Sequence, residues 1–228
     1  MLFVKSARFI GVAGGSCSGK TLFARRLGDA LAMRARGGGG DERTGDGGLD
    51  SAAAGCAIVS IDSYYFGLAD AAPEAIERYN FDDPAALDHE LLADHLSRLA
   101  SGHAADVPVY DFSTHTRAGD VRRIEPAGFV IVEGLFSLYW DDVRAALDIK
   151  VFIDLPHDEC LARRIERDTW ERGRPREEII RRYETMARPM YDEYVLPSRS
   201  HADVVVDGKR PVVESIETVL RVVDEGPR

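Results

Sequence analysis

The feature that most constrains the fold is a glycine-rich run near the start of the chain, Gly14-Gly15-Ser16-Cys17-Ser18-Gly19-Lys20-Thr21. It matches G-x-x-x-x-G-K-[ST] in full and follows an apolar run, residues 9–13, that is typical of a buried parallel strand. The glycines allow successive N–H groups to turn toward an anion, and a helix predicted over residues 22–31 adds its positive dipole end. A chance glycine-rich turn would lack this strand and helix. The run therefore predicts a phosphate-binding loop.

All eight residues of this loop are candidates for binding a nucleotide: Gly14, Gly15, Ser16, Cys17, Ser18, Gly19, Lys20 and Thr21. Lys20 is expected to reach the β- and γ-phosphates, and the Thr21 hydroxyl is expected to hold Mg²⁺. A helix N-terminus can lower the pKa of a thiol, so Cys17 can make activity sensitive to oxidation. The alternative for Cys17 is a small side chain that the loop tolerates.

Length and composition limit the classes of protein that fit. The 228 residues, 45% of them hydrophobic, suffice for one substantial core, so we expect a single domain over residues 1–228. The net charge of -10 argues against a broad nucleic-acid surface and favours a small anionic ligand. Cys17, Cys56 and Cys160 show neither disulfide nor zinc spacing, which fits a cytoplasmic setting. No signal-peptide core or membrane-spanning apolar run is evident, so we expect no membrane partner.

Further apolar runs alternate with predicted helices. Strands are expected within residues 57–61, 129–134 and 149–154, and this alternation favours a parallel sheet with right-handed crossovers. The other expected elements are helices over residues 88–101 and 212–223 and a strand within residues 202–208. The fold class that follows is α/β, a three-layer P-loop NTPase fold with a central parallel sheet.

Two carboxylates follow predicted strands. Asp62 comes directly after residues 57–61, and Glu133 ends the next apolar run. Ligands bind at the carboxyl ends of the strands in such sheets, so Asp62 can accept a proton from a substrate hydroxyl that faces the γ-phosphate. The alternative is an aspartate that caps a helix or a turn. With Thr21, both carboxylates are candidates for the magnesium site.

A short extended segment, residues 107–112, carries aromatic and acidic side chains and is followed by His115 and Arg117. This combination suits a pocket for a flat polar ring. An edge hairpin with a half-buried aromatic face is the simpler interpretation, and the pattern alone favours it. We therefore expect a small β-hairpin region in addition to the central sheet.

Residues 34–55 are dense in glycine and are broken by charged side chains. The segment has no aromatic or apolar anchors, so its composition favours a flexible insertion over a functional lid.

Arginines concentrate in residues 163–182, where eight arginines stand against five acids. Arg163 and Arg167 are four residues apart, so one helix face can present guanidinium groups to phosphate, and Arg172-Gly173-Arg174 adds two more from a turn. This predicts an arginine-rich helical lid. The alternative is a solvated face of Glu–Arg pairs, which we favour for Arg176, Arg181 and Arg182.

With these motifs assembled, the chain resembles the uridine kinase (uridine-cytidine kinase) family over nearly its whole length outside the glycine-rich insertion. The family motif D-S-F-Y is similar to Asp62-Ser63-Tyr64-Tyr65, and the strand that ends in Glu-Gly is similar to the one that ends at Glu133-Gly134. Three longer motifs, N-F-D-H-P-x-A-F-D, V-P-x-Y-D-F-x-x-H-x-R and R-R-x-x-R-D-x-x-x-R-G-R, resemble residues 80–88, 107–117 and 163–174.

The resemblance implies transfer of the γ-phosphoryl group of ATP, with Mg²⁺, to the 5′-hydroxyl of uridine or cytidine. It implies that Asp62 is the base, and that Lys20, Arg167 and Arg172 complete the catalytic set. The implied substrate-binding residues are Tyr65, Phe81, Asp82, Tyr110, His115, Arg164 and Arg174. It further implies a nucleoside and a nucleotide as the binding partners, and a homotetramer.

Three residues depart from the family pattern: Asp83 replaces a histidine, Leu87 a phenylalanine and Arg182 a common glutamine. They bear on pocket shape, on the choice between uridine and cytidine, and on feedback inhibition.

Two rival hypotheses stay open. One is a kinase of another small alcohol, such as a phosphoribulokinase-like or pantothenate kinase-like protein, although a wall of Tyr110 and His115 suits a nucleobase better. The other is a regulator that binds nucleotide without useful transfer.

Overall fold

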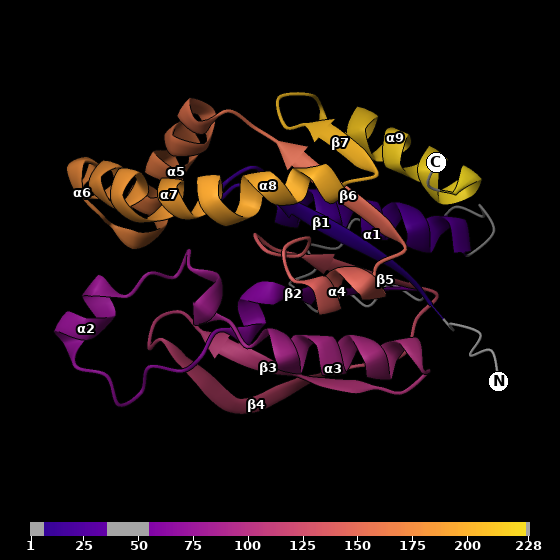
Figure 1. The fold of residues 1–228 in the computed structure, drawn as a ribbon, viewed down its shortest axis with the longest axis horizontal. Coiled ribbons are helices and arrows are strands. Elements are labelled where there is room, and N and C mark those ends of the chain that lie inside the picture. The colour runs from indigo at the N-terminus through magenta and orange to yellow at the C-terminus, as the bar shows by residue number, and fades with distance from the viewer. Residues whose placement is uncertain (1–6, 36–54, 227–228) are drawn as a thin grey trace.

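The computed structural model describes residues 7–35 and 55–226, and its centre is a parallel sheet of five strands (Figure 1). The strand order is β2-β5-β1-β6-β7, and every neighbouring pair is parallel. The strands are β1 (Arg8–Gly14), β2 (Cys56–Ser60), β5 (Phe129–Glu133), β6 (Ile149–Asp154) and β7 (Val204–Asp207). The expected α/β fold with a central parallel sheet is confirmed, because each strand falls on an apolar run of the sequence.

The sheet is covered on both faces, which makes three layers. Successive residues of a strand point to opposite faces. In β1, Phe9 and Ala13 join one apolar cluster, whereas Ile10 and Val12 join the other. The helices that complete these clusters are α3 (His89–Ala100) and α4 (Asp141–Ala146) on the side of Phe9, and α1 (Lys20–Ala35) and α9 (Val212–Glu225) on the side of Ile10.

The predicted hairpin is present as a separate two-stranded sheet. Strands β3 (Ala105–Asp111) and β4 (Thr116–Ile124) pair antiparallel, with a register shift between Pro108 and Tyr110. The hairpin packs beside α3 and is not an edge of the central sheet (Figure 1). The interpretation as a hairpin was correct, but its expected place at an edge was wrong.

The arginine-rich segment forms two helices. Helix α5 (His157–Arg172) ends at Gly173, which has a φ of 61° and so adopts the left-handed conformation that commonly closes a helix. Helix α6 (Arg176–Arg182) continues through a π-helical turn, α7 (Arg188–Met190), a second π-helical turn and α8 (Leu196–Ser198), which Figure 1 draws as one long rod. The sequence did not predict these π-helical turns.

Two boundaries differ from the sequence expectations. Helix α1 runs from Lys20 to Ala35, beyond the expected residues 22–31, so Arg34 and Ala35 belong to a helix and not to the insertion. Residues 36–54, the rest of the expected insertion apart from Gly55, lie outside the described residues. A further short helix, α2 (Pro73–Arg78), precedes α3. In the part of the chain that the structure describes, no helix combines the length and apolarity needed to cross a membrane.

Candidate active site

A cleft of about 710 Å³ opens where the carboxyl ends of β1, β2 and β5 meet. Its volume lies in the range of small-molecule sites, which is about 300–1,000 Å³. The expected site residues that line it are Ser16, Cys17, Gly19, Lys20, Thr21, Asp62, Tyr65, Phe81, Asp82, His115, Glu133, Arg164, Arg167, Arg172 and Arg174. The remaining expected residues, Gly14, Gly15, Ser18 and Tyr110, do not line this cleft.

The glycine-rich run forms a tight loop around the Lys20 ammonium. Lys20 is only 8% exposed, and its Nζ donates to the Gly15 carbonyl oxygen at 2.8 Å. Gly14 has a φ of 145°, and a Cβ there would lie 2.5 Å from the carbonyl oxygen of Ile153, so the loop requires glycine at this position. Cys17 also has a positive φ, 62°, which is uncommon for a residue with a side chain. The strand and the helix hold the loop in this conformation.

Glu133 is buried at the end of β5 with both carboxylate oxygens held in place. The Thr21 hydroxyl donates to Oε2 at 3.2 Å, and the Ser60 hydroxyl donates to Oε1 at 2.8 Å. Ser60 was not among the expected residues. Only the pairing of β2 with β5, which sets Ser60 opposite Glu133, brings the two together.

Asp62 lies on a 3-10 helix (Ile61–Tyr64) directly after β2. It does not cap that helix, and it forms no hydrogen bond or ion pair with any residue that the structure describes. Its side chain is exposed to the cleft, and partial desolvation by the surrounding walls is the largest cause that raises its pKa to about 6. The neighbouring carboxylate of Glu133 raises the pKa further, whereas Lys20 lowers it.

The oxygen donors at this end of the cleft fit a magnesium ion that arrives with a nucleotide. Mg²⁺ prefers oxygen ligands and is held by one or two carboxylates together with substrate phosphates. Thr21, Asp62 and Glu133 supply such donors beside the phosphate-binding loop. Within residues 7–35 and 55–226, no group of three or more His, Cys, Asp or Glu side chains is arranged to hold a metal by itself.

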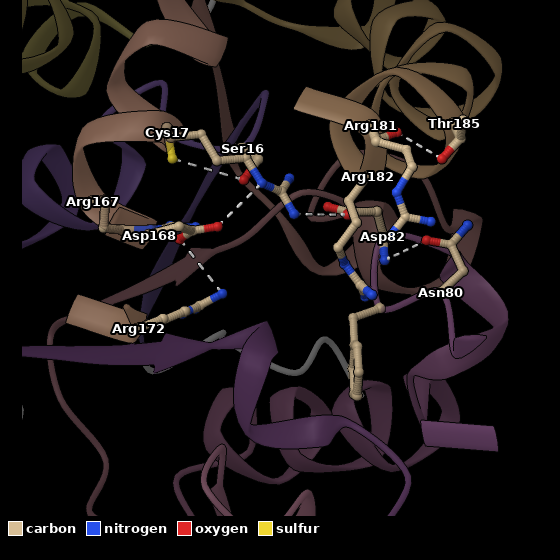
Figure 2. A network of polar contacts seen from close by, with 12 residues as sticks. Ser16, Cys17, Asn80, Asp82, Arg167, Asp168, Arg172, Arg181, Arg182 and Thr185 are labelled. Carbon is tan, nitrogen blue, oxygen red and sulfur yellow. Dashed lines mark hydrogen bonds and ion pairs between the residues drawn. The ribbon is translucent and has the colours of Figure 1, made fainter. Parts of the chain in front are cut away.

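Asp168 organises the arginines of α5, and it was not among the expected site residues (Figure 2). Its side chain is 1% exposed. Arg167 approaches its Oδ1 with Nε at 2.9 Å and Nη2 at 2.8 Å, while Arg164 and Arg172 each lie 3.6 Å from the carboxylate. The alternative of a solvated face of Glu–Arg pairs therefore does not hold for Arg164, Arg167 and Arg172, because they surround a buried acid. The expectation of such a face was wrong for Arg182, which lines the cleft and donates to the Glu77 carbonyl oxygen.

The backbone of Asp168 fixes the turn that follows. Its carbonyl oxygen accepts hydrogen bonds from the N–H groups of Gly173 and Arg174. Arg164 also reaches across the cleft, with Nη2 3.5 Å from Oδ2 of Asp82. Its Nη1 is buried without a hydrogen-bond partner among the described residues. The cleft thus presents a guanidinium with an unused donor beside Asp82.

An aromatic wall closes the other end of the cleft. The rings of Phe81 and His115 stack with centroids 4.8 Å apart, and the Tyr65 hydroxyl donates to the Phe81 carbonyl oxygen at 2.9 Å. Tyr110 packs behind this wall against Tyr65, with centroids 5.3 Å apart. The Tyr110 hydroxyl and the His115 Nδ1 are buried without partners among the described residues. The wall therefore combines apolar ring faces with unused polar atoms.

His115 sits in a strained and positively charged environment. Its φ of 54° is positive, and among described residues with side chains only Cys17, in the same cleft, shares this feature. Such backbone strain often marks functional sites. Burial lowers the pKa of His115 first, and the charges of Arg174 and Arg172 lower it further, so the imidazole is neutral at pH 7.

A sequence model of the Phosphoribulokinase / Uridine kinase family matches residues 9–214. The chain belongs to this family. Among the relatives of this family member, the uridine kinase of Shewanella amazonensis is 36% identical over 209 residues, which covers 91% of each chain. The uridine kinase of Vibrio atlanticus is 35% identical over 197 residues, covering 86% of this chain and 85% of that protein.

Solved structures share the fold of this phosphoribulokinase/uridine kinase family member. Phosphoribulokinase from Rhodobacter spheroides superposes with a TM-score of 0.61 at 17% identity, over 91% of this chain and 74% of that one. D-glycerate 3-kinase from Cryptococcus neoformans gives 0.57 at 19% identity, over 83% and 79% of the two chains. The expected P-loop kinase fold and the family resemblance are both confirmed.

Proposed function

We propose that this protein transfers the γ-phosphoryl group of ATP to the 5′-hydroxyl of uridine or cytidine. The observation that carries the proposal is one cleft with a phosphate-binding loop at one end, Asp62 in the middle and the aromatic wall of Phe81 and His115 at the other. Relatives named uridine kinase match about nine-tenths of the chain, which supports the same activity.

The phosphates of ATP bind in the loop around Lys20, where backbone N–H groups and the ammonium offset their charge. Thr21 and Glu133 would hold the magnesium ion, with Asp62 nearby. When bound, the ion neutralises charge on the β- and γ-phosphates. The hydrogen bond from Ser60 keeps Glu133 in position for this role.

The nucleoside occupies the space between Asp62 and the aromatic wall. Asp82 and Arg164 hold the ribose hydroxyls, because together they offer acceptors and an unused guanidinium donor. Phe81 and His115 frame the base, and Tyr65 fixes the Phe81 backbone. This placement directs the 5′-hydroxyl toward Asp62, which accepts its proton as the hydroxyl oxygen attacks the γ-phosphorus. The bond from the γ-phosphorus to the β,γ-bridging oxygen breaks, and ADP leaves with that oxygen.

The arginines of α5 and the following turn act from the far side of the transferring group. Arg167 and Arg172, arranged around Asp168, offset negative charge on the phosphoryl oxygens, and Arg174 contacts the bound nucleoside. We propose that α5 and α6 serve as a lid over the cleft. Exclusion of water there favours transfer over hydrolysis.

A coupled ADP-release assay tests the proposal with magnesium-ATP against uridine, cytidine, adenosine, ribulose 5-phosphate and pantothenate. We expect turnover with uridine or cytidine. The Asp62→Asn substitution should lower kcat about 100- to 10,000-fold, the usual contribution of a general base, with little change in nucleoside KM.

Asp120→Asn, the same substitution at an exposed site on β4, is the control and should keep wild-type turnover. Near-normal turnover of the Asp62→Asn protein would contradict the assigned base. Turnover only with ribulose 5-phosphate or pantothenate would favour a kinase of another alcohol. Silence with every acceptor despite ATP binding would favour a nucleotide-binding regulator.

A further inference from the structure

Arg117 joins the β3–β4 hairpin to the segment that carries Asp62. It lies on β4, two residues after His115, and is half-buried, with 28% of its side chain exposed. Its Nε donates to the Tyr65 carbonyl oxygen and its Nη2 to the Tyr64 carbonyl oxygen, both at 2.9 Å. Tyr64 is the last residue of the 3-10 helix that carries Asp62, and Tyr65 caps it. The last carbonyl groups of a helix have no partner within it, so Arg117 closes this helix from the hairpin.

A third partner ties the same guanidinium to helix α3. Nη1 and Nη2 of Arg117 both donate to Oδ2 of Asp88 at 3.1 Å. Oδ1 of Asp88 accepts from the Leu91 N–H and caps α3. The backbone N–H of Asp88 also donates to the Tyr64 carbonyl oxygen, at 2.9 Å. All three nitrogens of the Arg117 side chain are therefore engaged, in the planar fork that arginine provides and lysine does not.

A backbone contact fixes the hairpin at a second point. The Leu68 N–H donates to the His115 carbonyl oxygen at 2.8 Å. Together with the bonds from Arg117, this contact holds the hairpin against the segment that follows Asp62. His115 forms half of the stacked aromatic wall. The bonds of Arg117 therefore set the spacing between the Asp62 carboxylate and that wall.

Arg117 is not among the described residues that line the cleft, so its influence on turnover has to pass through the groups that it holds. We propose that Arg117 is a positioning residue, which fixes the spacing between Asp62 and the aromatic wall. A nucleoside held by the wall then presents its 5′-hydroxyl to Asp62, and water does not take its place at the γ-phosphorus. The inference rests on the proposed function and adds to it the residue that aligns the acceptor.

The test compares Arg117→Met with wild type in the ADP-release assay, with uridine or cytidine as acceptor, and measures the nucleoside monophosphate formed in the same samples. Misplacement of reacting groups by about 1 Å can cost about 100-fold, so we expect kcat to fall about 10- to 100-fold. The KM for ATP should stay within about twofold of wild type, because the partners of Arg117 lie outside the phosphate-binding loop.

The ratio of monophosphate to ADP distinguishes misalignment from loss of folded protein. When the 5′-hydroxyl is displaced, water competes for the γ-phosphoryl group, so the ratio should fall below that of wild type. Loss of folded protein would lower both products alike and leave the ratio unchanged.

Two further variants separate the carbonyl bonds from the ion pair. Arg117→Lys keeps a positive charge beside Asp88, but one ammonium cannot reproduce the fork to both carbonyl oxygens, so its kcat should lie between those of Arg117→Met and wild type. It also carries the same measurements if the methionine variant fails to fold. Asp88→Asn leaves the carbonyl bonds in place and should keep kcat within about fivefold of wild type, the usual size of a partly exposed ion pair.

The control is Arg123→Met, the same substitution farther along β4. The ion pairs of Arg123 with Asp106 and Glu125 are exposed, so this variant should keep the wild-type kcat and product ratio. A wild-type kcat or product ratio in Arg117→Met, or equal impairment of Asp88→Asn and Arg117→Met, would overturn the inference alone. Full activity of Arg117→Lys would do the same. Absence of turnover with either nucleoside in the wild-type protein would instead overturn the proposed function.

Discussion

Asp168 is the most buried charged residue in the part of the chain that the structure describes, with 1% of its surface exposed. A carboxylate in such a place is costly unless it is paired, and Arg164, Arg167 and Arg172 all approach it. The buried carboxylate of Asp168 serves to position the arginines. One buried anion keeps three mutually repelling guanidinium groups at the edge of the same cleft.

Removal of this anion should destabilise the fold. In Asp168→Asn, the buried guanidinium of Arg164 loses a partner, and breaking a buried ion pair typically costs about 3–5 kcal/mol. We expect a loss of about 3 kcal/mol in the free energy of unfolding, measured by urea denaturation. Glu166→Gln, on the exposed face of the same helix, should stay within about 0.5 kcal/mol of wild type. Equal stability of the two variants would refute the anchoring role.

His95 gives the stability a pH dependence. The Tyr64 hydroxyl and His95 Nδ1 lie 3.0 Å apart in the core, and burial lowers the pKa of His95 below 6.5. Between the lowered pKa of the folded state and the pKa of about 6.5 in the unfolded state, the unfolded chain binds a proton that the folded protein does not. The free energy of unfolding therefore falls as pH drops below about 6.5. His95→Gln should lose this component. Urea titrations at pH 7.5 and 5.5 measure it, and identical pH dependence in both proteins would contradict the prediction.

At the scale of elements, the end of β5 and the 3-10 helix that carries Asp62 touch at a single glycine. Gly134 has a φ of 155°, and a Cβ there would lie 2.7 Å from the Cβ of Ile61. The close approach sets the position of Asp62 relative to Glu133. Both carboxylates therefore depend on the absence of a side chain at Gly134.

Gly134→Ala should accordingly cost about 1–3 kcal/mol of stability, the usual penalty for overpacking, and should lower kcat because Asp62 shifts. Thermal unfolding and the ADP-release assay measure the two effects. Gly119→Ala on β4 is the matched control, since a Cβ there meets nothing within 4 Å. If the two alanine variants have equal stability and equal kcat, the contact with Ile61 does not constrain the site.

The elements that the sequence predicted well are those with a local signal. The apolar runs identify all five strands of the central sheet, and Asp88 was correctly placed at the start of α3, whose backbone it caps. The last turn of α1 was missed because Met33 and Arg34 are exposed there, beyond the apolar periodicity. The π-helical turns after α6 leave no periodic pattern that a local analysis can detect.

For the whole molecule, motifs predicted which residues line the cleft, but not what holds them there. The sequence did not predict Ser60 as a site residue, because its contact with Glu133 exists only once the two strands pair. It did not predict Asp168 either, because the contact with Arg164 exists only once the helix buries one face. Tyr110 was expected in the pocket, yet its ring lies behind Tyr65. The homotetramer and the role of residues 36–54 stay predictions, since a single chain and the described residues test neither.

The strand order also determines when the site can form during synthesis. Strand β2 pairs only with β5, and β1 pairs only with β5 and β6, within the described sheet. A nascent chain that has not reached Phe129 therefore contains the phosphate-binding loop and Asp62, but no strand that pairs with either of their strands. Contacts between segments so distant along the chain slow folding and leave strand edges exposed meanwhile. Until the ribosome has added β5, the phosphate-binding loop and Asp62 lack the strand that holds β1 and β2 together in the folded sheet.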